Sequence, residues 1–343
     1  MRVRTKFVSL VMAAVVAVPM LAVSIPAGEV KAENTYKLSD YGIKPDDNKS
    51  DTADINNFIS ETIGSGGGTI VFDSGTYDIN ILDFDGYGVG INITKPNISF
   101  QLAQGTELKV KPTTIGEYCV ISVKADGFKI SGGKITGDRS SNGKSGADGH
   151  GIGVIDCKNV TISDMTICNN WGDGIYLGSM NLEDSLYGCD GVSITNCTIS
   201  NNRRNNIAIV DADNVTIDSC KILKAKGAQP SCGINIEPNA VNGKIPADEV
   251  CKNITIKNTK VTCVKQGTSN WYFAFQTIKD PSKPKMASAK NVKIIKCNFG
   301  GDVSNYSGKK FTIKNTKITG TFYDNKNMKT KVKKCKIKKY YKY

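Results

Sequence analysis

The sequence predicts an all-β protein, a right-handed parallel β-helix with three strands per coil and a short N-terminal capping helix. A short segment recurs along the chain, with apolar residues at its first, third and eighth positions and a polar pair at its fourth and fifth. A further short apolar strand stands between some copies, and long loops interrupt the chain only around that strand. Such self-similarity is typical of solenoids.

The first 32 residues have the features of a secretory signal peptide. A basic start precedes an apolar stretch interrupted by Pro19, and the small-residue pattern Val30-Lys31-Ala32 follows. We therefore expect a secreted, extracellular protein that begins near Glu33, with a single β-helix domain over residues 33–343. No other segment approaches the run of about 18 apolar residues that a membrane-spanning helix needs, so we expect no membrane partner.

Positive charge is concentrated at the C-terminal end. The net charge is +13, but residues 309–343 alone contain thirteen lysines and one acid, Asp324. Because residues 33–308 are close to neutral, we expect no nucleic-acid partner. The lysine-rich end, 309–343, is predicted either to attach to acidic cell-wall polymers or to be a solvated end that prevents strand-edge pairing.

The capping helix is predicted within "SDTADINNFISETIG", with Ser50 or Asp51 as N-cap and Gly64 as its end. Its apolar residues fall on one helical face: Ile55, Phe58, Ile59 and Ile63. Such a helix can cover the open first coil of a solenoid. The segment "GGGTIVFDSGTYDI" then begins the coils.

The repeat itself predicts two short strands joined by a two-residue bend. Its copies are "FKISGGKI" (128), "VTISDMTI" (160), "VSITNCTI" (192), "VTIDSCKI" (215), "ITIKNTKV" (254), "VKIIKCNF" (292), "FTIKNTKI" (311) and the weaker "TKVKKCKI" (330). The sixth position is a column of small residues that includes Cys197, Cys220, Cys297 and Cys335. We therefore expect reduced, packed cysteines instead of the disulfides that eleven cysteines in a secreted chain would suggest.

Asparagines recur just before the copies, at Asn159, Asn214, Asn253 and Asn291. Asparagine tolerates left-handed backbone and hydrogen-bonds its neighbours, so a stacked asparagine column at a bend is expected. The additional strand is "GIGV" (151), "GIYL" (174), "NIAI" (206) and "GINI" (233). Three strands per turn favour a β-helix, and hairpin signals for a sandwich are scarce.

The N-terminal run "LSDYGIKPDDNKSDTADINNFISETIGSGGGTIVFDSGTYDI", followed by coils of the "NVTISDMTICNN" type, resembles the pectate lyase superfamily. That superfamily includes polygalacturonase-like glycoside hydrolases, polysaccharide lyases and some phage tailspikes. The resemblance covers nearly all of residues 33–343 and implies the β-helix fold and an action on polysaccharides.

Loops enter or leave the additional strand at 138–150, 179–190, 223–232 and 238–252. Loops on both sides of one strand face predict a groove for an extended polymer, with that face as its floor. Aligning the strands on Ile152, Ile175, Ile207 and Ile234 puts equivalent residues about 4.8 Å apart on neighbouring coils. His150, the only histidine, should therefore lie beside Asp173, with Arg204 and Asn205 on the next coil.

The predicted substrate is an acidic, pectin-like polysaccharide that contains uronates. Trp171 and Tyr176 offer apolar faces for sugar rings, and Arg203 and Arg204 suit carboxylates. The outward positions of the floor complete the predicted substrate-binding set, with Asn205 beside them: Tyr176, Asn206, Asn235 and Glu237.

Glycoside hydrolysis is slightly preferred, and it needs two carboxyl groups about 5 to 9.5 Å apart. We predict Asp173 as the acid, Asp148 as its partner and His150 beside them, with Glu237 too far along the strand to take part. The resemblance places the "WGD" segment where polygalacturonase-like hydrolases carry a paired "DD", which implies a carboxylate at Asp173.

Two alternatives remain open. A lyase would use Arg203, Arg204 or His150 as base, and Asp173 with Asp190, Asp211 or Asp213 would hold calcium. A non-catalytic adhesin would use the same groove without paired titrating groups. Outside the lyase alternative we expect no metal or cofactor, and in every case a monomer.

Overall fold

The computed structural model describes residues 34–84, 87–142, 146, 148–179, 188–238, 251–264, 272–278 and 288–343. The chain divides into two units, 1–32 and 33–343, and only the second is described below. The predicted signal peptide therefore lies outside the described residues, as do most of the predicted loops 179–190 and 238–252.

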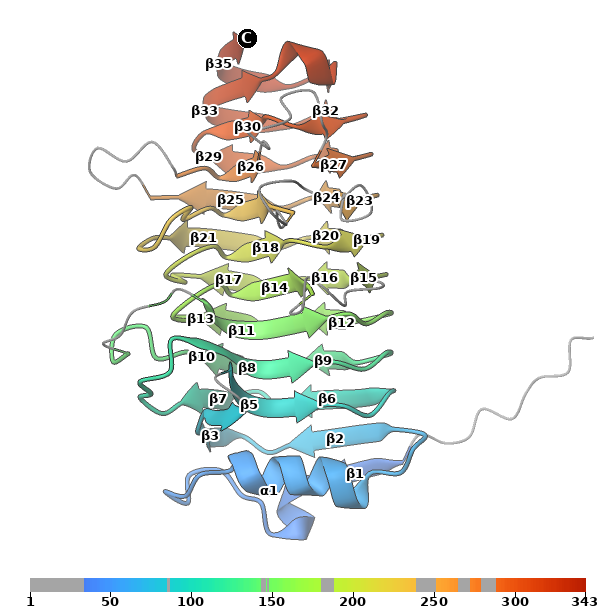
Figure 1. Cartoon of the computed structure of the whole chain (residues 1–343), viewed down its shortest axis with the longest axis vertical. Helices are drawn as coiled ribbons and strands as arrows, with labels where there is room; N and C mark the ends of the chain where they lie inside the picture. Colours follow the sequence, from blue (N-terminus) through green and yellow to red (C-terminus); the bar gives the residue numbers. More distant parts are fainter. Residues whose placement is uncertain are drawn as a thin grey trace, which may run out of the picture. The chain divides into compact units, whose positions relative to one another are not determined.

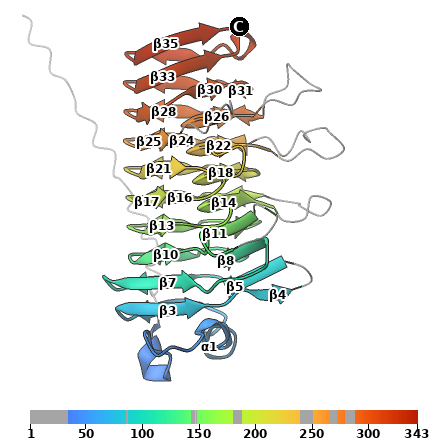
Figure 2. The ribbon, with the colours of Figure 1, turned by 90° about the vertical axis from the view of Figure 1, so that its left-hand side faces the viewer.

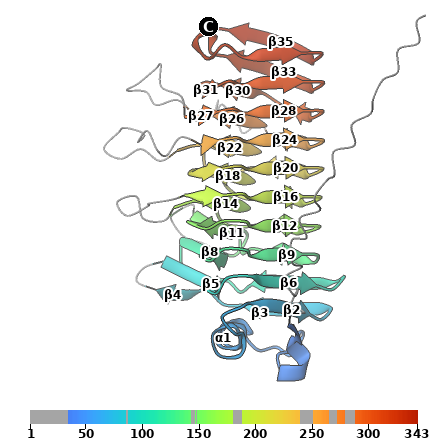
Figure 3. The ribbon, with the colours of Figure 1, turned by 90° about the vertical axis from the view of Figure 1, so that its right-hand side faces the viewer.

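Residues 34–343 form stacked coils of short strands, and nearly every strand pairs in parallel with its equivalents on the coils before and after it (Figure 1). The first sheet contains the first strand of each coil (Figure 3): β1 (Thr35–Lys37), β2 (Gly68–Phe72), β6 (Ile98–Leu102), β9 (Lys129–Ser131), β12 (Thr161–Ser163), β16 (Ser193–Thr195), β20 (Thr216–Asp218), β24 (Thr255–Lys257), β28 (Lys293–Ile295), β32 (Thr312–Lys314) and β34 (Lys331–Lys333).

A larger sheet contains two further rows of strands (Figure 2). One row is β3 (Gly75–Ile79), β7 (Thr106–Val110), β10 (Lys134–Thr136), β13 (Thr166–Cys168), β17 (Thr198–Ser200), β21 (Lys221–Ala225), β25 (Lys260–Cys263), β29 (Asn298–Gly300), β33 (Lys317–Asp324) and β35 (Lys336–Lys342). The other row, called here the third-strand face, is β5 (Tyr87–Ile93), β8 (Glu117–Val123), β11 (Asp148–Ile155), β14 (Ile175–Gly178), β18 (Ile207–Ile209), β22 (Ile234–Ile236), β26 (Phe275–Thr277) and β30 (Val303–Asn305).

The remaining strands form a narrow third sheet and one antiparallel pair. A narrow sheet runs along one corner of the coils: β15 (Cys189–Asp190), β19 (Ala212–Asp213), β23 (Cys251–Lys252), β27 (Ala289–Lys290) and β31 (Gly308–Lys309). Strand β4 (Leu82–Phe84) pairs antiparallel with β5.

The predicted registry is confirmed on the third-strand face. Ile152 pairs with Ile175, Ile175 with Ile207, and Ile207 with Ile234. The column continues through Phe275 and Val303, and all of these side chains are fully buried. Stacked apolar columns of this kind form the core, so the fold is a right-handed parallel β-helix, as predicted.

The capping helix is present but shorter and less regular than predicted. Helix α1 (Thr52–Asn57) continues into a π-helical turn, η2 (Phe58–Thr62), and a 3₁₀ turn, η1 (Leu38–Tyr41), precedes it. The apolar face is buried as predicted: Ile55, Phe58, Ile59 and Ile63. Asp51 does not cap its own helix; its carboxylate accepts the Asp78 N–H at 2.7 Å, and burial raises its pKa to about 6.

The predicted cysteine and asparagine columns are confirmed. All eleven cysteines are free, and most are buried. Asn214, Asn253 and Asn291 all have φ between 52° and 57°, and the Asn291 amide donates to the Asn253 side-chain oxygen at 2.6 Å. None of the helices in the described ranges is long and apolar enough to cross a membrane.

Candidate functional site

The residues that alternate with the core column on the third-strand face form one row across neighbouring coils, in which Tyr176 is half-buried and the residues that follow it are fully buried. Register places Tyr176 beside Ala208, and Ala208 beside Asn235. The row continues to Gln276 and then Ser304. Two of the four loops that were expected to wall this row into a groove, 179–190 and 238–252, lie mostly outside the described residues, so that part of the prediction stays open.

His150 and Asp173 lie side by side on neighbouring coils, as the sequence predicted. The distance from His150 Nδ1 to Asp173 Oδ2 is 3.5 Å, and the Asp173 backbone N–H donates to His150 Nδ1 at 3.2 Å. Because Nδ1 accepts this bond, it carries no proton. Burial lowers the pKa of His150, and the carboxylates of Asp173 and Asp148 only partly oppose that effect. The imidazole is therefore neutral and not part of an ion pair.

Asp173, predicted as the acid on the floor of a groove, is not on the surface. Its exposed fraction is 0%, and both of its oxygens have partners. Oδ1 accepts the Asn205 backbone N–H at 2.6 Å, and Oδ2 accepts Arg204 Nη1 at 3.0 Å. The Arg204 side chain comes from the next coil and covers the carboxylate. Asp173 is thus an interior ion-pair partner, placed beneath the face instead of on it.

The expectation that Glu237 lies too far away is also wrong. Arg204 Nη2 donates to Glu237 Oε2 at 3.0 Å, so one guanidinium joins Glu237 to Asp173 across three coils. The long arginine side chain spans the distance that strand spacing alone suggested was too great. Burial alone would lower the pKa of Arg204, but the charges of Asp173 and Glu237 outweigh it and raise that pKa.

Glu237 is the carboxyl group of this network that solvent can reach, because its side chain is 27% exposed. Oε2 is fixed by Arg204 and by Asn235 Nδ2, which donates at 2.6 Å. No group within the described ranges donates to Oε1. Burial raises the pKa of Glu237, Arg204 opposes that shift, and the Asp173 charge adds to it. One oxygen is held and the other is free to carry a proton.

The predicted sugar platform and uronate clamp are not formed by the residues expected. Trp171 is only 8% exposed, and the Arg203 guanidinium covers its ring at 3.8 Å from the centroid. Arg203 also donates to the Gly146 carbonyl at 2.7 Å, and Arg204 is used by its two carboxylates. Both arginines therefore stabilise the protein's own groups, and Trp171 packs under one of them.

Of three further predicted substrate-binding residues, two asparagines are buried in the interior and one tyrosine is partly exposed on the face. Asn206 is buried and satisfied by Asn202 and the Leu223 carbonyl, so it is a structural residue and not an outward one. Asn205 is also buried, and its side-chain oxygen accepts the Cys232 N–H. Tyr176 is half-buried; its ring stacks on His150 at 4.8 Å.

Asp148 is the carboxyl that the sequence predicted as the partner of Asp173. It is the first residue of β11, half-buried, and pairs in register with Glu117 of β8. Its charge acts on the imidazole of His150 and on both arginines, Arg203 and Arg204. It therefore belongs to the same electrostatic cluster as Glu237.

Sequence reasoning missed Gln276. Neither atom of its amide has a hydrogen-bond partner, although the residue is fully buried in the outward row. The Oδ1 atom of Asn235 beside it is likewise unpaired. The signal was "FAFQTI" (273), in which Phe275 and Gln276 take the places of Ile234 and Asn235, but Thr277 stands where "GINI" has its second isoleucine.

The calcium site expected for a lyase is not assembled in the described part of the chain. There, no group of three or more His, Cys, Asp or Glu side chains is placed to hold a metal. Asp190 and Asp213 lie on the corner sheet, where they accept from Asn214 and Asn253, and both oxygens of Asp173 are already used.

His150 supplies a direct test of this electrostatic arrangement. A folded-state pKa below 6.5 means that His150 contributes stability above pH 6.5, which is lost as pH falls through the window below that value. We expect the single imidazole signal in an NMR titration to give a pKa under 6.5, and His150→Gln to flatten the pH dependence of unfolding there. A pKa above 6.5 would instead indicate a charged pair with Asp173.

Comparison with known proteins supports the fold. No protein-family profile matches the sequence. The "Uncharacterized protein YclG" of Bacillus subtilis (strain 168) is 30% identical over 245 residues, which cover 66% of this chain and 41% of that protein. The "SPbeta prophage-derived uncharacterized protein YorA" of the same organism is 30% identical over 193 residues, or 52% and 32% of the two chains. The chain thus spans less than half the length of either relative.

Solved structures with the same coil architecture come from phage and from polysaccharide-degrading enzymes. ORF18 of Geobacillus virus E2 has a TM-score of 0.58 at 15% identity, over 90% of this chain and 58% of that one. Tailspike gp49 of Acinetobacter baumannii bacteriophage Fri1, a capsular polysaccharide depolymerase, has a TM-score of 0.50 at 15% identity, over 88% and 57%. An iota-carrageenase complexed to iota-carrageenan fragments has a TM-score of 0.50 at 17% identity, over 84% and 57%. At these identities the likeness concerns the fold, which is the pectate lyase-like right-handed parallel β-helix.

Proposed function

We propose that the protein is a secreted glycoside hydrolase that binds an acidic polysaccharide along the third-strand face, with Glu237 as general acid. The observation that carries this proposal is the state of Glu237. It is partly exposed, one oxygen is held by Arg204 and Asn235, and burial raises its pKa. A general acid works best when its pKa is brought close to the operating pH.

The chemistry requires a proton for the leaving glycosidic oxygen and a second carboxylate near the anomeric carbon. Glu237 supplies the proton from Oε1, while Arg204 and Asn235 hold Oε2 and fix the orientation of the carboxyl group. The second carboxyl is not assigned: Asp148 begins β11, three coils before Glu237, and at about 4.8 Å per coil this axial separation alone exceeds the limit of about 9.5 Å. Asp173 and His150 take positioning roles in this proposal: Asp173 anchors Arg204, and His150 supports the Tyr176 ring.

Unpaired amides support the recognition of sugar hydroxyl groups. Asn235 Oδ1 and both amide atoms of Gln276 lack partners on neighbouring coils, next to Glu237. A buried polar group without a partner costs about 1–3 kcal/mol. Both residues have an exposed fraction of 0%, so a ligand whose hydroxyls bond to these amides recovers part of that free energy only by displacing what covers them.

Binding without cleavage is the second candidate. It is favoured by the burial of Asp173 and by the engagement of both arginines within the protein, since these leave fewer groups for chemistry. An adhesin of this kind would contact the polymer through the partly exposed groups of this face, Tyr176 and Glu237.

Product analysis on a panel of polyuronates tests the proposal. Hydrolysis should release new reducing ends without ultraviolet-absorbing unsaturated products, and a chelator should leave the rate unchanged. Because the acid must be protonated, the rate should fall as pH rises through the raised pKa of Glu237. Unsaturated products would select a lyase, and binding without products would select the adhesin.

A further inference from the structure

Lysines of the last coils stack in columns along the axis. On the corner sheet Lys252 pairs with Lys290, and Lys290 with Lys309. On the first sheet Lys293, Thr312 and Lys331 are stacked in the same way. Residues paired in this way on neighbouring coils lie about 4.8 Å apart. The directly paired lysines of the corner sheet repel one another at this spacing, whereas on the first sheet Thr312 separates Lys293 from Lys331. The corner column therefore opposes folding.

The same columns carry other residues in earlier coils. On the corner sheet, Asp190 and Asp213 occupy the positions that Lys252, Lys290 and Lys309 take later. At the bend, the asparagines give way to Lys310 and Lys329, which have φ of 52° and 51°. This left-handed region favours asparagine over lysine. The last two coils thus place positive charge where local backbone geometry prefers a neutral residue.

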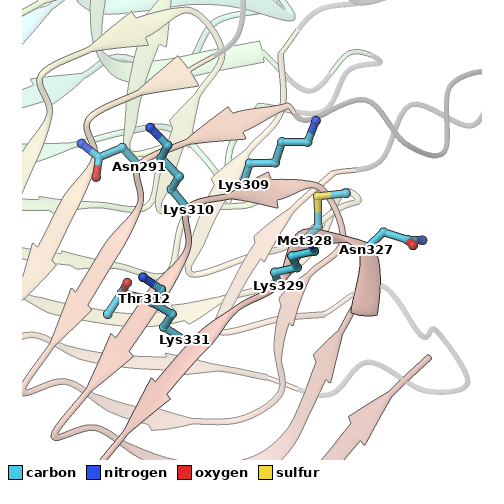
Figure 4. Close-up of a pocket in the computed structure, with 8 residues that line it drawn as sticks. All are labelled: Asn291, Lys309, Lys310, Thr312, Asn327, Met328, Lys329 and Lys331. Carbon is cyan, nitrogen blue, oxygen red and sulfur yellow. The ribbon is translucent and has the colours of Figure 1, made fainter.

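The columns meet at a pocket of about 630 Å³ (Figure 4). Four lysines line it, and no carboxylate does: Lys309, Lys310, Lys329 and Lys331. The rest of the lining is neutral: Asn291, Thr312, Asn327 and Met328, the last two from the 3₁₀ turn η3 (Lys326–Met328). Lysine and amide donors around one hollow are complementary to an anion.

Internal acids do not neutralise these lysines. Residues 288–343 contain sixteen lysines and two acids, Asp302 and Asp324. Asp302 accepts the Thr321 N–H, and Asp324 is buried and accepts from Thr330 and Tyr340. Within the described residues, no ion pair includes a lysine beyond Lys257.

We propose that this lysine pocket is an anchoring site for an anionic polysaccharide, which seats one carboxylate or other anionic substituent in the pocket and runs along the lysine columns. The ammonium group of lysine is a hydrated point charge without the planar fork of arginine. The site therefore selects charge density over a particular sugar, and its affinity depends on salt. The pocket lining lacks the aromatic and arginine side chains on which nucleic-acid bases stack.

The test compares two full-length variants with the same change in net charge. The pocket variant combines Lys309→Gln, Lys310→Asn, Lys329→Asn and Lys331→Gln, with asparagine at the two positive-φ positions. The control replaces exposed lysines of the early coils by Gln: Lys44, Lys109, Lys124 and Lys129. The probes are polygalacturonate, its fully methyl-esterified neutral form and single-stranded DNA of similar length, at about 50 and 200 mM salt.

We expect the pocket variant to lose roughly tenfold or more in affinity for polygalacturonate at low salt, and the control less than about twofold. The neutral polymer, which has no charge for the pocket to hold, should bind the parent and the pocket variant equally, and the pocket variant should melt no lower than the parent. Equal losses in both variants, undiminished binding by the pocket variant, or tighter binding of DNA than of polygalacturonate would overturn the proposal. This anchor rests on the proposed function, and the pocket variant should cleave a short oligogalacturonide as fast as the parent, so weaker polymer binding with unchanged cleavage separates a failed anchor from a failed hydrolase.

Discussion

Glu237→Gln is expected to reduce polysaccharide cleavage by about 10²- to 10⁴-fold, the usual contribution of a general acid. Glutamine keeps an oxygen for Arg204 and Asn235 but has no proton of suitable acidity to give to the leaving oxygen. Initial rates from reducing-end release, measured with the parent and the variant at equal enzyme concentration, give the ratio.

The Glu237→Gln rate needs a control variant on the same face. Glu117→Gln changes an exposed carboxyl of the same face and should leave the rate nearly unchanged. If Glu237→Gln cleaves as fast as the parent, Glu237 is not the acid, and the hydrolase proposal loses its principal support.

Asp173→Asn is expected to destabilise the fold by about 3–5 kcal/mol, the cost of breaking a buried charge pair from one side. The carboxylate is fully buried and holds both the Arg204 guanidinium and the Asn205 N–H. Its removal leaves Arg204 with Glu237 as its only remaining carboxylate partner in the described network. Urea unfolding of the parent and the variant measures the difference.

The control for this substitution is Asp213→Asn on the corner sheet, which is expected to cost under about 1 kcal/mol. In a double-mutant cycle, Asp173→Asn and Arg204→Gln together should cost less than the sum of the two single changes. A stable Asp173→Asn protein that has lost activity would instead support the catalytic role predicted from sequence.

The repeat made the fold and the registry predictable, because stacking is a property of the backbone period. Aligned isoleucines were enough to place His150 beside Asp173 and Arg204 on the following coil. Burial was not predictable in the same way, because it depends on side chains from the next coil. Arg204 covers Asp173, and Arg203 covers Trp171.

The sequence also could not show how far a side chain extends between coils. Strand spacing alone put Glu237 outside the site, but the length of one arginine side chain brings it in. The sequence analysis missed Gln276 because the loops around its strand differ in length from the others and Thr277 replaces the second isoleucine that marks the neighbouring strands. Both errors concern side chains and loops that the repeat does not constrain.

A crystal structure of the Glu237→Gln variant with a bound oligogalacturonide tests the proposed site most directly. We expect the sugar chain to lie across β11, β14, β18 and β22, with a glycosidic oxygen within about 3.2 Å of residue 237 and sugar hydroxyls bonded to Asn235 and Gln276. An oligosaccharide bound elsewhere, with residue 237 still contacting only Arg204 and Asn235, would contradict cleavage on this face.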